Sequence, residues 1–151
     1  MKTKQTGFTL IELIVVIGII AILAAIVLVA LSMAKKKSDD TGKIRALQEV
    51  RSALQLFNTD KGYYPPTANY RTDIINNKYI TEINITGLKY IALPPYCTDT
   101  TCNSYHLGVS LENSNNNVLT VDKDSSNGFE GKSTNCGNVQ STIDTCYDIE
   151  P

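Results

Sequence analysis

The distribution of apolar side chains divides the chain into an apolar part, an amphipathic part and a polar part. From Leu13 to Leu31, 19 consecutive residues carry no charge, and nearly all of them are Ile, Leu, Val or Ala. Further along, apolar residues recur three or four positions apart, a spacing typical of an amphipathic helix. This stripe comprises Ile44, Leu47, Val50, Leu54 and Phe57. The pattern predicts one long helix over residues 8–58, apolar all round in its first half and on one face in its second.

Residues 59–151 are polar, and their pattern predicts a small head of strands and loops. Residues 60–62 and the two prolines after them signal the end of the helix, because glycine and proline do not continue a helix. Residues 63–104 form a connecting region with a helical or mixed stretch near 73–80. Alternation over 105–112 predicts a half-buried strand, followed by an asparagine-rich turn and a return strand over 118–121.

A third strand is expected near residues 146–149. Two strands alone are marginally stable, so their apolar face needs a cover, and the helical stripe supplies it. The predicted fold class is therefore α+β, with a long N-terminal helix packed on a small antiparallel sheet.

The average composition hides this division. Hydrophobic residues make up 42% of the chain and charged residues 19%, and the formal net charge is -1. Residues 35–58 are basic and residues 59–151 are acidic, but neither segment is basic enough to predict nucleic-acid binding. A multipass membrane protein is excluded, because no second apolar run approaches the ~20 residues that span a bilayer.

All four cysteines lie in the polar part, with the spacings Cys-x4-Cys and Cys-x9-Cys. Zinc sites usually show tighter pairs of cysteines, and the second pair lacks that form. An even number of cysteines beyond a hydrophobic segment favours two disulfides in an oxidising compartment. Three connectivities are open, and we favour nearest neighbours, Cys97 with Cys102 and Cys136 with Cys146.

The N-terminal apolar run is too long for a cleaved signal peptide and lacks a small-residue cleavage site. Taken alone, it predicts a single-span membrane anchor. Glu12 argues for more than an anchor, because a carboxylate deep in a bilayer costs ~2.5–3.5 kcal/mol on insertion scales. An acid in such a place is a candidate functional residue that needs a partner.

The segment GFTLIE, from Gly7 to Glu12, resembles the class III leader of type IV prepilins and type II secretion pseudopilins. The resemblance covers residues 2–34. It implies a pilin fold, and it implies that a prepilin peptidase cuts between Gly7 and Phe8 and N-methylates Phe8. The chain then divides into a leader, 1–7, a transmembrane or filament-core half-helix, 8–34, an amphipathic half-helix, 35–58, and a disulfide-containing head, 59–151.

Cleavage would give Glu12 a partner, because the new amine of Phe8 is largely cationic at neutral pH. The resemblance implies that this partner is the Phe8 amine of a neighbouring subunit in a filament. Pairing within one chain, one helical turn away, is the competing interpretation. Many family members have Gly at the position of Ala21 and Pro at that of Val29, so unwinding of the helix near Gly18 stays open.

The resemblance implies a structural subunit and not an enzyme. Its partners would be copies of itself, the peptidase, the cytoplasmic membrane before assembly and, indirectly, an assembly platform and an ATPase motor. The head would lie outside the cytoplasm and then in a filament on the bacterial surface. We favour a type IV pilus used in adhesion, twitching motility or DNA uptake. The alternatives are the major pseudopilin of a type II secretion system and a single-span membrane sensor or binding protein.

Other candidate sites are few. Asp122, Asp124 and Ser126 resemble the opening of a calcium loop, and major pseudopilins carry such a loop late in the head; a solvated acidic turn is the interpretation we prefer. We expect His106 to be a solvated residue on the polar side of a strand, and the tyrosines of residues 63–96 to pack semi-buried. Asn84-Ile85-Thr86 fits a glycosylation sequon, which is short enough to occur by chance.

Overall fold

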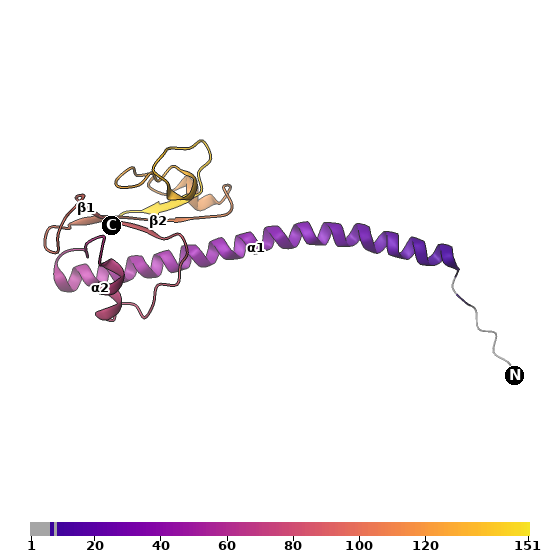
Figure 1. Cartoon of the computed structure of the whole chain (residues 1–151), viewed down its shortest axis with the longest axis horizontal. Helices are drawn as coiled ribbons and strands as arrows, with labels where there is room; N and C mark the ends of the chain where they lie inside the picture. Colours follow the sequence, from indigo (N-terminus) through magenta and orange to yellow (C-terminus); the bar gives the residue numbers. More distant parts are fainter. Residues whose placement is uncertain (1–6, 8) are drawn as a thin grey trace. The chain divides into compact units, whose positions relative to one another are not determined.

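A computed structural model of the chain describes Gly7 and residues 9–151 (Figure 1). It contains two compact units, Met1–Lys36 and Lys37–Pro151. The helix α1, Leu10–Lys61, contributes residues to both units. Gly18 and Gly42 both lie inside α1, and the helix continues through each of them.

In the first unit, the apolar side chains of α1 are exposed along its whole length. The large hydrophobic residues from Leu10 to Met33 are between 49% exposed at Val16 and 76% at Leu10. This stretch is long and apolar enough to cross a membrane by length and composition. Exposed apolar surface of this extent is unfavourable in water, so the segment requires lipid or other apolar helices around it.

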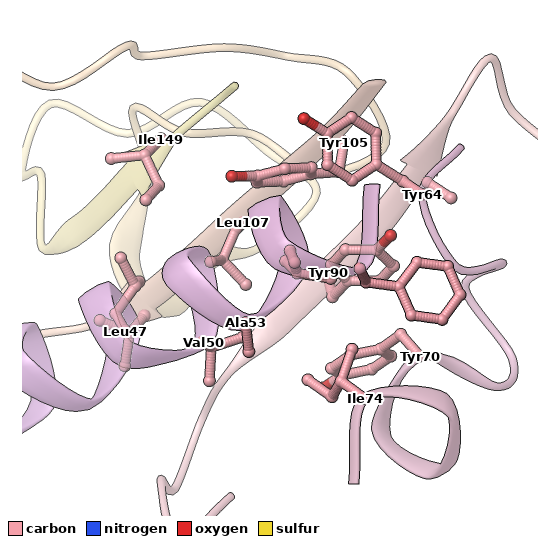
Figure 2. Close-up of a cluster of buried hydrophobic side chains, with 14 of the residues drawn as sticks. Leu47, Val50, Ala53, Tyr64, Tyr70, Ile74, Tyr90, Tyr105, Leu107 and Ile149 are labelled. Carbon is pink, nitrogen blue, oxygen red and sulfur yellow. The ribbon is translucent and has the colours of Figure 1, made fainter. Parts of the chain in front are cut away.

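In the second unit, one face of α1 forms the floor of the hydrophobic core. The buried apolar residues of α1 are Leu47, Val50, Ala53, Leu54 and Phe57, which confirms the predicted stripe. Figure 2 shows several of them with Leu107, Ile149 and a group of tyrosines. The helix ends at Lys61, three residues beyond the predicted end. Gly62 follows with φ of +84°, the left-handed conformation that commonly ends a helix.

The sheet has three antiparallel strands in the order β1-β2-β3. These are β1 (Lys89–Leu93), β2 (Ser104–Ser110) and β3 (Cys146–Ile149). Tyr90 lies opposite Leu107, and Val109 lies opposite Tyr147. The third strand is confirmed, whereas β1 lies within the predicted connecting region. The α+β class is confirmed.

The predicted return strand over 118–121 is wrong. These residues form most of a 3-10 helix, η1 (Asn117–Thr120), which is capped by the Asn116 side chain accepting a hydrogen bond from the Val118 N–H. The place beside β2 is taken by β3 from the end of the chain. Helix α2, Tyr70–Asn76, begins earlier than the helical stretch predicted near 73–80.

Of the six tyrosines expected to pack semi-buried, Tyr63 and Tyr79 do so, and three others are buried outright. Tyr64, Tyr70 and Tyr90 lie in the core, and Tyr90 stacks on Tyr70 with ring centroids 4.4 Å apart. The Tyr90 hydroxyl donates to the Pro65 carbonyl at 2.7 Å. Tyr96 differs, because its side chain is fully exposed.

A second layer of the head covers the sheet face that points away from α1. It is formed by residues 121–145, including the short helix η2 (Thr134–Cys136), and it has its own small core around Phe129. Gly108 of β2 packs closely against this layer. A Cβ atom added at this position would lie 2.8 Å from the Phe129 ring. Strand β2 is therefore buried on both faces, and the prediction of a half-buried strand is wrong.

Candidate functional site

The predicted processing site lies at the N-terminal edge of the described residues. Gly7 is exposed. Phe8 lies outside the described residues, so cleavage after Gly7 and N-methylation of Phe8 stay predictions. Helix α1 begins two residues later, at Leu10.

Glu12 lies in the first turn of α1 and closes a local hydrogen-bonded loop with Thr9. Its Oε2 accepts from the Thr9 backbone N–H and from the Thr9 hydroxyl, both at 2.8 Å. The Glu12 N–H donates back to the Thr9 hydroxyl oxygen at 3.3 Å. This is a capping box, in which a Thr and a Glu three residues apart satisfy each other's backbone groups. The Thr-x-x-Glu spacing carried this signal in the sequence, and our sequence analysis missed Thr9.

The capping box leaves Glu12 able to serve a second partner. A carboxylate has about four lone-pair sites, and the bonds from Thr9 all reach one oxygen. The other oxygen receives no hydrogen bond among the described residues. A cation on a neighbouring chain can therefore pair with Glu12 without removing the cap.

At the start of the second unit, Asp40 connects α1 to the segment that follows β2. Its side chain is fully buried, and its two oxygens accept from consecutive backbone N–H groups of Glu112 and Asn113, at 2.7 and 3.0 Å. Lys43 lies 3.8 Å from Glu112 beside this contact. A buried carboxylate is tolerated when it is fully hydrogen-bonded, and here the bonds fix the helix against the sheet.

The head contains the two disulfides that we favoured, Cys97–Cys102 and Cys136–Cys146. The first closes a short loop between β1 and β2. The second joins η2 in the covering layer to the first residue of β3, and both of its cysteines are fully buried. The second disulfide therefore holds the covering layer onto the sheet.

His106 is fully buried, so its prediction as a solvated residue is wrong. Its Nε2 lies 2.6 Å from Asp148 Oδ2, and its Nδ1 lies 2.8 Å from the Asn127 carbonyl oxygen. Asp148, also fully buried, accepts from the backbone N–H groups of Asp124 and Ser125. Both ring nitrogens of His106 therefore lie at hydrogen-bond distance from oxygen atoms, and the pair links β2 and β3 to the acidic loop. The covering layer packs on the polar side of β2, and His106 is therefore in the interior of the head.

Asp122 and Asp124 lie where the acidic loop begins, and β3 brings Asp148 beside them. Carboxylate oxygens of these three residues lie within 4.8 Å of one another. Burial, together with the charges of Asp148, Asp144 and Asp124, raises the pKa of Asp122 to about 7. Ser126 is exposed. Asp148 is 24 residues from Asp124 in the sequence, so no local spacing could have linked it to the loop.

These carboxylates fit a calcium ion by the chemistry of their donors, because calcium takes oxygen ligands and carboxylates above all. The Oδ2 atom of Asp122 is buried and receives no hydrogen bond within the described part of the chain. Asp148 Oδ1 keeps acceptor capacity beyond its single bond from Asp124. The Lys132 ammonium lies 3.9 Å from Asp124 Oδ2.

Known proteins resemble the chain at its N-terminus and beyond. Residues 2–32 match a family profile described as the prokaryotic N-terminal methylation motif. The chain is 30% identical over 136 residues to the type II secretion system core protein G of Escherichia coli (strain K12), a match that covers 89% of this chain and 92% of that protein.

Other relatives match over a shorter length. The core protein G of Aeromonas hydrophila is 35% identical over 75 residues, which is 50% of this chain and 52% of that protein. The type IV wide pilus major component PilA4 of Thermus thermophilus is 38% identical over 80 residues, 53% of this chain and 60% of that protein. No solved structure matches the chain.

Proposed function

The chain belongs to the family of type IV prepilins and type II secretion pseudopilins, and we propose that it is the major pseudopilin of a type II secretion system. The observation that carries the proposal is the match to the E. coli core protein G, which extends through the head to 92% of that protein. The pilus relative matches over a smaller share of both chains. The proposal therefore replaces the type IV pilus that the sequence analysis favoured.

Members of this family are structural proteins, anchored in the membrane by the N-terminal helix before they assemble. In the proposed cycle, a prepilin peptidase removes residues 1–7 and methylates the new terminus. The apolar side chains of α1, exposed in the single chain, then leave lipid for contact with the same helix of neighbouring copies. An assembly platform and an ATPase motor drive this transfer.

Glu12 supplies the register of the filament in this proposal. Its free oxygen pairs with the Phe8 amine of the neighbouring subunit. An unpaired charge between packed apolar helices is strongly disfavoured, so only the stagger that joins the two groups is stable. The capping box with Thr9 holds the Glu12 side chain at the end of the helix, close to where the terminus begins.

A type IV pilus subunit is the second candidate, favoured by the 38% identity to a pilus component and by the two disulfides of the head. Deleting the gene in its native cells separates the two functions. We expect exported proteins to accumulate in the cell envelope while surface fibres, counted by electron microscopy, stay unchanged. Loss of surface fibres with normal secretion would instead identify a pilus subunit.

The proposed role includes a calcium ion at Asp122 and Asp124, with Asp148 as the third carboxylate. The ion would neutralise the like charges gathered there and so fix the covering layer on the sheet. Calorimetric titration of the full chain in detergent should show one calcium bound. Asp122→Asn and Asp124→Asn should abolish the binding, and Asp99→Asn, an exposed acid elsewhere in the head, should retain it. Equal calcium binding by the wild-type chain and the three variants would show that these carboxylates do not hold the ion.

A further inference from the structure

Asn84 is the one asparagine of this sequence that is followed two residues later by Ser or Thr without an intervening proline. Glu82 precedes it by the same distance, which extends the pattern to Glu-x-Asn-x-Thr. The segment lies between α2 and β1, in a stretch without helix or strand.

Polar and apolar side chains of the segment differ in their exposure to solvent. Exposure alternates from residue to residue: Glu82, Asn84 and Thr86 are exposed. Ile83 and Ile85 between them are half-buried and pack against the hydrophobic core. In an extended chain, alternate side chains point to opposite sides. The isoleucines therefore anchor the segment and turn the acceptor asparagine, with its two flanking polar groups, toward solvent.

The backbone around Asn84 is also accessible to the active site of another protein, because few hydrogen bonds hold it in place. The N–H groups of residues 82–85 donate no hydrogen bond within the described part of the chain, and the Asn84 side-chain amide makes none there either. The one contact to this backbone is long, from Arg71 to the Ile83 carbonyl at 3.5 Å. Shallow depressions of about 200 and 460 Å³ lie on the two sides of Asn84, against the Ala46 face of α1.

We propose that Asn84 is an acceptor for an N-linked glycan. The donor is an oligosaccharide carried on a polyprenyl diphosphate, and a membrane-bound oligosaccharyltransferase catalyses the transfer. A bond forms between Asn84 Nδ2 and C1 of the first sugar, while the bond from C1 to the diphosphate oxygen breaks. The electron pair of that bond leaves with the polyprenyl diphosphate, and the amide proton passes to a base of the transferase. Glu82 and Thr86 are the flanking groups that the transferase recognises.

This inference rests on the proposed function in one respect, because the head must lie outside the cytoplasm to meet such a donor. The test uses the full chain extracted from the membranes of its native cells. Digestion with trypsin without reduction yields the peptide Tyr79–Lys89, which contains the whole pattern. Its mass and fragment ions report any sugar on Asn84. The same digest reports whether Cys97 and Cys102 are joined, and hence whether the head reached an oxidising compartment.

We expect the wild-type peptide to carry one glycan, with the first sugar on Asn84 in the fragment spectrum. Asn84→Gln and Thr86→Ala should abolish the heavier form completely, and Thr86→Ser should retain it, because Ser supplies the same hydroxyl. Retention in Thr86→Ala would contradict N-linked transfer. A wild-type peptide of unmodified mass would overturn the proposal that Asn84 carries a glycan. If Cys97 and Cys102 are joined in that digest, only the glycan proposal is contradicted. If they are reduced, the proposed location of the head outside the cytoplasm is contradicted as well.

Discussion

The pairing of His106 with Asp148 is the residue-scale feature on which the covering layer depends. Asp148 receives the imidazole and two backbone N–H groups of the acidic loop, so one buried carboxylate organises residues from β2, β3 and the loop. Breaking a buried pair by removing one partner leaves an uncompensated charge, which commonly costs 3–5 kcal/mol.

His106→Leu should therefore lower the free energy of unfolding of the head by about 3 kcal/mol. Urea denaturation of the full chain in detergent, followed by tyrosine fluorescence, measures the change. His106→Gln keeps an N–H donor for one of the two acceptors, and its loss should be smaller. If His106→Leu unfolds at the same urea concentration as the wild-type chain, the pair of His106 and Asp148 does not stabilise the covering layer.

The raised pKa of Asp122 predicts that the stability of the head depends on pH. Its pKa is about 7 in the folded head, against ~3.9 in an unfolded chain. Between these values the folded state binds more protons, so the stability from this carboxyl is complete below about pH 4 and is lost as the pH rises through 7. In a chelator, Asp122→Asn should raise the melting temperature at pH 8 more than at pH 5. A rise of equal size at both pH values would contradict this origin.

At the scale of elements, α1 stabilises the head through one face only. Leu54→Ala removes a fully buried side chain and should destabilise the head by ~2–5 kcal/mol. Leu56→Ala makes the same substitution on the opposite face, at a residue that is 55% exposed, and should change stability by less than about 0.5 kcal/mol. Thermal melting of both full-length variants tests the prediction. Similar losses would show that the helix is covered on both faces.

The disulfide Cys136–Cys146 links two elements, η2 and β3. On the chain-entropy model, closing its loop stabilises the head by ~2–3 kcal/mol. Replacing both cysteines by Ser should lower the melting temperature of the head. It should also make the covering layer around Phe129 more susceptible to proteolysis. The packing of Leu107 on α1 should persist, because that core lies on the other face of the sheet. An unchanged melting temperature would mean that the covering layer holds without the bond.

The sequence predicts α1 and the core that it covers better than the second layer of the head. The α1 stripe repeats over several turns, so its period identifies both the helix and the buried face. Strand β1 has only five residues and is followed by two prolines, which hid its alternation. His106 alternates with apolar neighbours as a surface residue would. What buries it is a loop some twenty residues away in the sequence, whose position no local pattern encodes.

At the scale of the whole molecule, Glu12 tests the proposed assembly. Glu12→Ala should leave cleavage and membrane insertion intact and abolish or reduce filaments, because the neighbour's amine would lack a counter-ion in an apolar core. Thr9→Ala removes the cap but keeps the charge, and should still assemble. Accumulation of exported proteins in the cell envelope reports the loss of filaments, and intact-protein mass reports the cleavage. Normal secretion with Glu12→Ala as the only subunit would refute the pairing.

Asp40 also determines how the head bears mechanical load. It is the first buried residue along α1, and it accepts hydrogen bonds from two consecutive backbone N–H groups just after β2. In the proposed assembly, a force applied along α1 would reach these two hydrogen bonds before it reached the apolar contacts of Leu47 and Val50. Because the two hydrogen bonds lie side by side, they would share that force, and the head would then move with the helix instead of separating from it.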